Sequence, residues 1–301
     1  MFLMTSIGEK IKDLREYYGI SQKALCDGIC SQAYISRLEK GEINVSADIL
    51  FLLSKRLGVE VNFFFNNYQS PSSDYLSITM NEINEATRNR NYRHLEEIVS
   101  LELKNPSTNE NTEIKQFLLW HKGICVYHLN NEVGTAIKYI DQALAYSLTT
   151  NRNYSEREIE ILLSKAIILF DSKNYKLSQE TFEMITYNLK NNIYLVNPRI
   201  HIRAYYNYSR LLYEMGKYHE VIEASMKGIQ QAKNYELLYL MGDLYFQVGR
   251  GYEKLCQFEK AYSNFEKSKN CFELNNEEEL VELAQERIEE LVDKSKSKLR
   301  L

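Results

Sequence analysis

The chain has 301 residues, of which 44% are hydrophobic and 26% are charged, a composition typical of folded globular proteins rather than of disordered ones. Its three prolines and twelve glycines are too few for a collagen-like, linker-like or turn-dense all-β chain. The net charge of −4 excludes a globally basic nucleic-acid coat, although it leaves room for one small DNA-binding module.

The cysteines and the hydropathy of the chain indicate a reducing compartment. Five cysteines, with no CxxC pair, argue against a disulfide framework or a zinc ribbon. Cys26 and Cys30 share a helical face, but no histidine lies near them in sequence, so we expect small buried side chains rather than a metal site. No apolar run approaches the ~20 residues of a membrane span, and we therefore expect a cytoplasmic protein without a membrane segment.

Capping and terminating residues divide the first 65 residues into short helices. The serines that can cap helices are Ser21, Ser31 and Ser46, and the glycines that can end them are Gly19, Gly41 and Gly58. The apolar residues at helical spacing are Ile7, Ile11, Leu14 and Tyr18 in the first helix, Ala24, Leu25 and Ile29 in the second, and Ile35 and Leu38 in the third. Four or five helices of about ten residues, joined by short turns, are typical of a helix-turn-helix bundle.

From residue 74 the pattern changes to long helices in pairs. Five points where a turn leads into the second helix of a pair recur, four of them marked by an aromatic residue: Tyr92/Leu95, Val133/Ala136, Tyr175/Ser178, Tyr218/Val221 and Phe258/Ala261. Successive points are separated by 41, 42, 43 and 40 residues. Spacing of this regularity predicts a helical solenoid.

One of these units fits the tetratricopeptide spacing W-x2-L-G-x2-Y…A-x3-F. The residues that occupy it are Tyr245, Val248, Gly249, Tyr252, Ala261 and Phe265. The unit with Trp120 and Ala136 occupies most of it, with Gly123 one place early. Small residues at these positions allow paired helices to approach closely, and we expect each helix to be roughly a turn longer than in the usual repeat of about 34 residues.

We therefore predict an all-α protein with a helix-turn-helix domain over 1–66, a linker over 67–74, about five tetratricopeptide-like repeats over 75–275 and a capping helix with a tail over 276–301. The expected solenoid is right-handed. The apolar stripe of the last helix is Leu280, Leu283, Ile288 and Leu291. The tail over 294–298 is expected to fray.

The third predicted helix carries residues suited to reading DNA. With its apolar residues turned inward, the outward and flanking ones are Gln32, Ala33, Tyr34, Ser36 and Arg37. Glutamine can pair with adenine through two hydrogen bonds, and an alanine or an aromatic ring can pack on a thymine methyl. The alternative interpretation is that these residues form only a solvated helix face.

Phosphate contacts are expected from the flanks of that helix and from the helix before it. Ser36 and Arg37 are suited to phosphate oxygens, as are Gln22 and Lys23 at the N-terminus of the second helix, where backbone N–H groups favour an anion. Glu39 is expected to pair within the domain, because a carboxylate is repelled by the DNA backbone.

The segments 20–25, 31–41 and 57–59 resemble the helix-turn-helix of the lambda-repressor/Xre family. Followed by five tetratricopeptide-like repeats, the full chain resembles the PlcR-type quorum-sensing regulators of the Rap/Rgg/NprR/PlcR/PrgX-like superfamily. The resemblance implies a lambda-repressor-like domain and a homodimer on a palindromic promoter site. It also implies a short imported signalling peptide that binds the concave repeat surface, alters the DNA-binding geometry and activates transcription.

Polar residues recur eleven positions before each turn into a second helix, on the helices expected to line the inner surface of the solenoid. They are Asn81, Lys122, Ser164, Asn207 and Gln247. Side chains that both donate and accept hydrogen bonds can hold the backbone of an extended peptide without reading its sequence. Asn207 and Gln247 match the amides that similar regulators use for this purpose.

Arginines and aromatic residues complete the predicted peptide site. The resemblance implies that Arg88 and Arg90 meet an acidic group of the peptide. Arg203 or Arg210 is suited to the C-terminal carboxylate of a peptide. The predicted apolar pockets are formed by Tyr206, Tyr213 and Phe246. The alternative is that each arginine pairs with an acidic neighbour such as Glu214 or Asp243.

The leading hypothesis is thus a peptide-responsive transcription regulator, and the alternative is a DNA-tethered scaffold whose repeats bind a folded protein partner. An enzyme is not expected, because the chain lacks HExxH, GxSxG, GxGxxG and Walker-type sequences. The histidines are His94, His121, His128, His201 and His219, and they form no cluster in the sequence. No cofactor and no metal site are expected.

Overall fold

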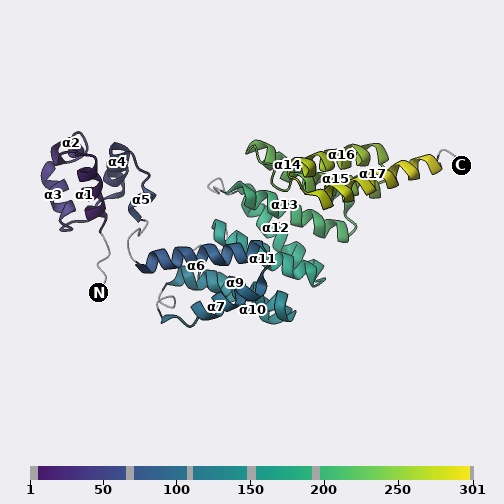
Figure 1. The fold of residues 1–301 in the computed structure, drawn as a ribbon, viewed down its shortest axis with the longest axis horizontal. Coiled ribbons are helices and arrows are strands. Elements are labelled where there is room, and N and C mark those ends of the chain that lie inside the picture. The colour runs from purple at the N-terminus through teal and green to yellow at the C-terminus, as the bar shows by residue number, and fades with distance from the viewer. Residues whose placement is uncertain (1–5, 66–70, 107–110, 148–153, 192–196, 299–301) are drawn as a thin grey trace. The chain divides into compact units, whose positions relative to one another are not determined.

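A computed structural model describes residues 6–65, 71–106, 111–147, 154–191 and 197–298. These residues form helices and no strand, so the prediction of an all-α protein is confirmed (Figure 1). The chain folds into two compact units, Met1–Asn89 and Arg90–Leu301. None of the helices is long and apolar enough to span a lipid bilayer, among the residues described.

The first unit contains a bundle of five short helices and one longer helix. They are α1 (Ile7–Tyr17), α2 (Gln22–Cys26), α3 (Gln32–Glu39), α4 (Ala47–Leu57), α5 (Asn62–Phe65) and α6 (Pro71–Arg88). Helix α6 begins at Pro71, inside the 67–74 segment predicted as a linker, and residues 66–70 lie outside the described part. Proline is favoured at the first position of a helix because its missing N–H has no partner there.

The predicted caps of the bundle are confirmed. Ser21, Ser31 and Ser46 each accept a hydrogen bond from the backbone N–H three residues later, at the starts of α2, α3 and α4. Gly41 and Gly58 adopt positive φ just past α3 and α4, a backbone region where glycine carries no steric penalty. These local signals account for where the helices of the bundle begin and end.

One apolar prediction and one helix assignment in the bundle are wrong. Tyr18 is 50% exposed. Helix α1 ends at Tyr17 and the chain turns at Gly19, so Tyr18 does not continue the buried face of the helix. Ile29 packs against the core as an apolar residue, but it lies outside the second helix, since α2 ends at Cys26 and Gly28 adopts positive φ. Both residues continue a helical spacing past the point where the backbone leaves the helix.

Close contact between α1 and α3 holds the bundle together. Gly8 packs directly on the backbone of Leu38, and a Cβ at Gly8 would lie 2.8 Å from the Leu38 carbonyl carbon and still nearer its oxygen. Ile11, Leu25 and Ile35 are fully buried in the core beside this contact. Only a glycine permits this approach, so the orientation of α3 depends on residue 8.

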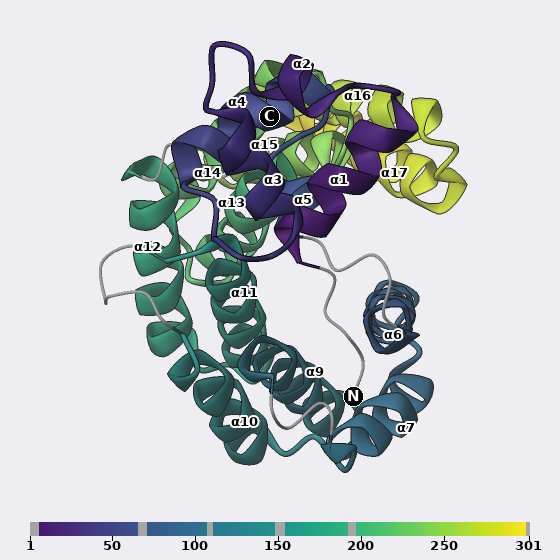
Figure 2. The ribbon, with the colours of Figure 1, turned by 90° about the vertical axis from the view of Figure 1, so that its left-hand side faces the viewer.

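The second unit is a series of helix pairs. The helices are α7 (Tyr92–Glu102), α9 (Thr112–Asn130), α10 (Val133–Ala145), α11 (Glu156–Asp171), α12 (Tyr175–Asn191), α13 (Pro198–Glu214), α14 (Tyr218–Asn234), α15 (Met241–Lys254), α16 (Phe258–Leu274) and α17 (Glu278–Lys298). Helices α7, α10, α12, α14 and α16 begin at the five residues at which the sequence predicted a turn into a second helix. Each of α10, α12, α14 and α16 packs against the helix before it (Figure 2).

Small residues bring the paired helices together as predicted. A Cβ on Gly123 of α9 would lie 2.9 Å from the Ala136 carbonyl oxygen of α10, and one on Gly249 of α15 would lie 2.7 Å from the Phe265 ring of α16. Ser178 of α12 is fully buried and donates a hydrogen bond of 2.8 Å to a carbonyl of α11. The repeat spacing therefore reflects a repeated close contact between helices.

Helix α17 packs against α16 at the C-terminal end of the second unit. Ile288 and Leu291 are buried as predicted, but Leu283 is 38% exposed and Ala284 takes the buried position instead. Spacings of four and three residues from Ala284 to Ile288 and Leu291 follow one helical face, from which Leu283 is rotated. Helix α17 continues to Lys298, through the segment 294–298 that the sequence analysis assigns to the tail.

Candidate functional site

Helix α3 presents the predicted DNA-reading residues on its surface. Gln32, Ala33 and Arg37 are exposed, and Tyr34 and Ser36 are half-buried, while Ile35 and Leu38 lie in the core. The structure thus brings the five predicted residues of this helix onto one solvent-accessible region. Their contact with DNA stays a prediction.

The exposed end of Arg37 is only weakly held. Its Nε lies 3.6 Å from a carboxylate oxygen of Glu42, and both side chains are exposed. A surface ion pair of this kind contributes less than about 1 kcal/mol, so a phosphate can replace the carboxylate at little cost. The Tyr34 hydroxyl donates to the Asn44 carbonyl at 3.3 Å, which orients its ring on the flank of α3.

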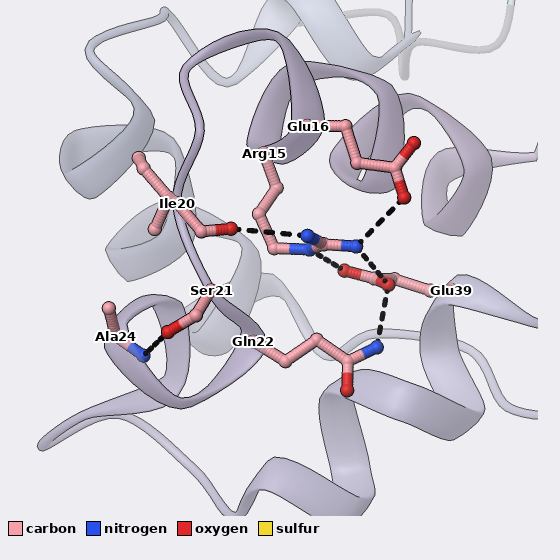
Figure 3. Close-up of polar contacts among 7 residues, drawn as sticks. All are labelled: Arg15, Glu16, Ile20, Ser21, Gln22, Ala24 and Glu39. Carbon is pink, nitrogen blue, oxygen red and sulfur yellow. Dashed lines mark hydrogen bonds and ion pairs between the residues drawn. The ribbon is translucent and has the colours of Figure 1, made fainter.

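A buried ion pair connects α1 to α3 beneath this surface (Figure 3). Arg15 donates to the two carboxylate oxygens of Glu39 at 2.6 and 2.9 Å, and it also donates to the Ile20 carbonyl at 3.1 Å. Glu39 is only 7% exposed. The prediction that Glu39 pairs within the domain is therefore confirmed, and the two-pronged contact sets the position of α3 against α1.

Gln22 belongs to the same network. Its Nε2 donates to Glu39 at 2.8 Å, and the side chain is half-buried. An amide nitrogen carries two hydrogens, so one remains for the predicted phosphate contact. Lys23, the next residue, is exposed. The structure thus gives Gln22 a positioning role between α2 and α3 that its sequence position did not indicate.

Arg56 is a further positioning residue that the sequence did not reveal. From α4 its Nη1 donates to the carbonyl of Leu25 at 3.2 Å, and it also contacts the carbonyls of Ala24 and Asp27. A guanidinium at the C-terminal end of α2 satisfies carbonyls that have no partner within the helix. No local pattern could have shown this contact, because the partners lie about thirty residues away.

In the second unit, the first helices of the pairs are linked by side-chain contacts. We call the polar residues on these helices the first-helix face, which comprises Lys122, Ser164, Arg203, Asn207, Arg210 and Gln247. Trp120 of α9 donates to Ser164 of α11 at 2.9 Å, and Glu160 of α11 pairs with Arg203 of α13 at 3.0 Å. Helix α11 also contacts α13, and α13 contacts α15.

Two amides of the first-helix face are covered by arginines. Asn207 and Gln247 are only 7% and 5% exposed. The amide oxygen of Asn207 accepts from Arg210 at 3.2 Å, and that of Gln247 accepts from Arg250 at 3.4 Å. Arg250 is held in turn over the Tyr213 ring, 3.5 Å from its centre. The same amide–arginine pair, three residues apart, thus occurs on α13 and again on α15. The amide nitrogen of Asn207 also donates to the Arg203 carbonyl at 2.9 Å, so the side chain is hydrogen-bonded at both its oxygen and its nitrogen.

Arg210 lies among aromatic rings and carboxylates. Its guanidinium is 5.1 Å from the centre of the Phe170 ring and 5.8 Å from that of Tyr206. Burial raises the pKa of Asp171 and that of Asp243, and the charge of Arg210 opposes the rise at both. Because aromatic faces hold a guanidinium without using its N–H groups, Arg210 keeps donors for an incoming carboxylate.

The other predicted basic residues are differently engaged. Lys122 forms a tight ion pair with Glu96 of α7 and also donates to Ser100 at 3.0 Å. Arg203 is paired with Glu160 at 3.0 Å, and its buried Nε has no hydrogen-bond partner. Lys122 and Arg203 are therefore paired with acidic neighbours, as in the alternative interpretation of the sequence.

Three predicted residues lie away from the first-helix face or outside its unit. Arg88 is in the first unit, and Arg90 begins the second with a positive φ; both are exposed. Phe246 packs edge-to-face on Phe265 at 5.2 Å, at the border of the core cluster that α16 forms with α17. Phe246 is half-buried, so part of its ring stays accessible, and its role in an apolar pocket for the peptide stays a prediction.

Comparison with known families matches both parts of this architecture. The RNPP family C-terminal domain matches residues 80–292, and a helix-turn-helix family matches residues 11–64. The chain belongs to the RNPP family. It therefore has the helix-turn-helix and C-terminal repeat domain of quorum-sensing regulators of the RNPP type, and DNA-binding transcription regulation is the activity of that type.

Solved structures of other regulators share the fold. Bacillus thuringiensis PlcR, in complex with the peptide PapR7 and DNA, is 24% identical with a TM-score of 0.76, over 93% of this chain and 98% of that one. ComR from S. thermophilus, in complex with DNA and its signalling peptide ComS, is 16% identical with a TM-score of 0.61, over 95% and 99%. The Streptococcus dysgalactiae SHP pheromone receptor Rgg2 is 13% identical with a TM-score of 0.64, over 95% and 99%. Among curated proteins, none matches this chain.

One cluster on this RNPP protein had no counterpart among the sequence predictions. The rings of Tyr92 and His128 stack in parallel with centres 3.8 Å apart. Burial lowers the pKa of His128, although the carboxylate of Asp171 opposes the change. Tyr92, His128 and Asp171 thus connect α7, α9 and α11, and Asp171 lies near Arg210 of the first-helix face. The sequence did not indicate this contact, because His128 and its partners belong to different repeats.

His121 belongs to the core of the RNPP domain. It is fully buried beside the rings of Phe117 and Trp120, and its Nδ1 lies 2.8 Å from the Phe117 carbonyl oxygen. Burial lowers the pKa of His121 to about 4. Within the described ranges, no three His, Cys, Asp or Glu side chains converge on a point suited to a metal ion.

Proposed function

We propose that this RNPP family member is a peptide-responsive transcription activator that binds a palindromic promoter site as a homodimer. In this proposal α3 of each protomer enters the major groove, and a short imported peptide occupies the first-helix face. Peptide binding changes the relative position of the two DNA-binding domains.

The DNA-binding part rests on the geometry of the bundle. Gln32, Ala33 and Arg37 are exposed on α3, and Arg15 and Glu39 hold that helix rigidly from beneath. A rigid helix with short polar side chains at its N-terminal end fits the arrangement that reads base edges in the major groove. The family match to residues 11–64 supports this assignment.

The peptide-binding part is carried by one observation, the arginine–amide pairs on α13 and α15. A peptide carboxylate attracts Arg210 away from Asn207, and the released amide then donates and accepts hydrogen bonds with the peptide backbone. Gln247 and Arg250 repeat the arrangement on the next first helix. Two similar structures, PlcR and ComR, were solved with both a peptide and DNA bound, which supports this assignment.

The DNA assignment is tested with Arg37→Ala and Gln32→Ala on palindromic promoter fragments. Arg37→Ala is expected to weaken binding to all sequences about equally and to flatten the salt dependence, because a phosphate contact carries no sequence information. Gln32→Ala is expected to relax the preference at one base pair, by about 1–3 kcal/mol. Fluorescence anisotropy at several salt concentrations measures both. Undiminished binding by both variants would remove α3 from the interface.

The peptide assignment is tested with peptides that co-purify with the protein from its host, identified by mass spectrometry and resynthesised with free or amidated C-termini. Calorimetry is expected to show binding of a peptide of about five to ten residues, and Arg210→Ala is expected to weaken it about 10- to 100-fold, the value of a charge-assisted hydrogen bond. Amidation of the peptide is expected to weaken binding to the wild type but not to Arg210→Ala.

The matched control is Arg199→Ala, which removes an exposed arginine of the same helix that lies over Tyr239. It is expected to leave peptide affinity unchanged. Asn207→Ala and Gln247→Ala are expected to weaken binding of both the free and the amidated peptide. Intact binding in these two variants would show that the peptide binds elsewhere, and binding only of a folded protein would favour a scaffold.

A further inference from the structure

A groove lies on another side of the second unit, between α12 and α14. Its volume is about 690 Å³, which is within the range of sites that hold small organic ligands. Tyr205, Tyr208 and Leu212 of α13 line it, together with residues of α12 and α14. At about 3.6 residues per turn, these three residues lie on the side of α13 opposite to Asn207 and Arg210. The groove is therefore separate from the first-helix face.

The ring of Tyr208 is held in place within the groove. It stacks on the fully buried ring of Phe182, with centres 5.5 Å apart and an angle of 23° between the two planes. Its hydroxyl donates to Glu183 of α12 at 3.5 Å. Because Phe182 packs against the ring on the core side, the part of Tyr208 that lines the groove is positioned before any ligand arrives.

Two carboxylates, one from each neighbouring helix, act on the Tyr208 hydroxyl. They belong to Glu183 of α12 and Glu220 of α14, which both line the groove and are both exposed. Burial raises the pKa of Tyr208, and the charges of Glu183 and then Glu220 raise it further. Since a charge acts strongly only at short range in a protein at ordinary ionic strength, both carboxylates lie near this hydroxyl.

These two carboxylates have no cation nearer than 4.0 Å among the residues that the structure describes. Glu183 accepts hydrogen bonds from the neutral groups of Gln179, at 2.6 Å, and Tyr208. Lys217 lies 4.0 Å from Glu220 and donates instead to Gln179 at 3.3 Å. Negative charge at the Tyr208 end of the groove is therefore only weakly compensated, and a positive group placed there gains electrostatic energy.

The remaining charges of the groove are paired or positive. Glu223 of α14 forms an ion pair with Lys227 at 2.6 Å on the same helix, so its charge is compensated within the protomer. Lys190 of α12 also lines the groove, seven residues after Glu183 and thus about 10 Å farther along the helix axis. A cation near Glu183 is attracted, whereas a second cation near Lys190 is repelled.

We propose that the α12–α14 groove binds a free organic monocation, a primary amine with an apolar body. Its ammonium group lies between Glu183 and Glu220 and donates hydrogen bonds to their carboxylates, and its apolar body lies on Tyr205 and Leu212. Lys190 excludes diamines and polyamines. This ligand site goes beyond the peptide and DNA contacts of the proposed function.

The first test is calorimetry of the full-length protein with phenethylamine. Phenethyl alcohol has nearly the same shape without the charge, and hexamethylenediamine carries a second ammonium group. The amine is expected to bind about 10-fold or more tightly than the alcohol, because hydrogen bonds to charged groups are stronger than those between neutral groups. It is also expected to bind more tightly than the diamine. Equal affinities for the amine and the alcohol would overturn the proposal.

The second test removes the two carboxylates one at a time. Glu183→Gln and Glu220→Gln are each expected to weaken phenethylamine binding about 10-fold, because the amide keeps the shape and loses the charge. Glu180→Gln is the matched control, since Glu180 is exposed on the same helix as Glu183 and does not line the groove. It is expected to leave binding unchanged. An equal loss in all three variants would reveal a general charge effect and would remove the site.

The third test is a gain of binding, which unfolding of a variant does not produce. Lys190→Glu is expected to strengthen hexamethylenediamine binding about 10-fold, because a second ammonium group then meets a carboxylate at the far end of the groove. Phenethylamine, which reaches only the Tyr208 end, is expected to bind this variant and the wild type about equally. A diamine affinity that stays unchanged would contradict the placement of the ammonium group.

The last comparison separates a free amine from the side chain of a protein. A short peptide with blocked termini and one central lysine presents the same ammonium group, and it is titrated under the same conditions. Weaker binding of this peptide than of phenethylamine is expected for a site that holds a free ligand. Tighter binding of the peptide, lost in Glu183→Gln, would overturn the free-ligand assignment and would indicate a protein partner with a basic side chain.

Discussion

Gly8→Ala is expected to unfold the DNA-binding bundle while the repeat unit stays folded. The new methyl group would lie 2.8 Å from the Leu38 carbonyl carbon and nearer still to its oxygen. Both of these atoms are backbone, so no side-chain rotation relieves the contact and α1 must move away from α3. Overpacking of this kind costs about 3 kcal/mol or more, a large part of the total stability of a bundle of roughly 60 residues.

The protein carries a convenient pair of probes for this experiment. Its single tryptophan, Trp120, lies in the second unit. Thermal unfolding followed by tryptophan fluorescence is therefore expected to match the wild type, while circular dichroism shows an additional loss of helix at lower temperature. Binding to promoter DNA is expected to disappear with that helix. Gly134→Ala is the control, because no atom lies within 4 Å of the added carbon. A wild-type circular dichroism curve for Gly8→Ala would contradict the close packing of α1 on α3.

Glu39→Ala is expected to produce the second largest effect, through a charge left without its partner. Arg15 is only 12% exposed at its side chain and directs two hydrogen bonds at Glu39. Removing one partner of a buried ion pair costs about 3–5 kcal/mol, because the remaining charge keeps its desolvation penalty. Gln22 loses its acceptor in the same substitution. The bundle is expected to unfold at lower denaturant concentration and to bind DNA weakly.

The controls for Glu39→Ala separate burial from charge. Glu42→Ala removes a carboxylate of the same domain whose ion pair with Arg37 is exposed, and it is expected to change stability by less than about 1 kcal/mol. Glu39→Gln keeps the shape and loses the charge, so an intermediate effect is expected. Urea titration followed by circular dichroism gives the order wild type, Glu42→Ala, Glu39→Gln, Glu39→Ala. Equal midpoints for Glu39→Ala and Glu42→Ala would show that the ion pair does not support the bundle.

Local chemistry explains why the helices were predictable. Ser21, Ser31 and Ser46 cap helices through a hydrogen bond that spans three residues, and Gly58 ends one through its own φ. Such contacts involve neighbours in the chain, so the sequence contains both partners side by side. The spacing of about 40 residues between second helices was equally readable, because each repeat must bury the same face against the next.

The candidate sites were only partly predictable. The exposed face of α3 followed from helical spacing, and so did the alignment of Ser164, Asn207 and Gln247 on successive first helices. The hydrogen bonds, ion pairs and burial of those side chains did not follow from the helical spacing. Asn207 accepts a hydrogen bond from Arg210, Arg203 is paired with Glu160, and Phe246 packs partly buried against the core. The angle at which helices pack determines these outcomes, and a linear spacing does not contain it.

The sequence alone thus determined the helices, their caps, the repeat phase and the family resemblance, since each of these depends on residues close together or on a regular period. The tertiary structure alone decided that Arg15 meets Glu39 and that Arg210 lies between aromatic rings from two repeats. The Arg15–Glu39 and Arg210–Phe170 contacts join residues 24 and 40 positions apart. Their energies come from burial and from charge at short distance, which exist only once the chain has folded.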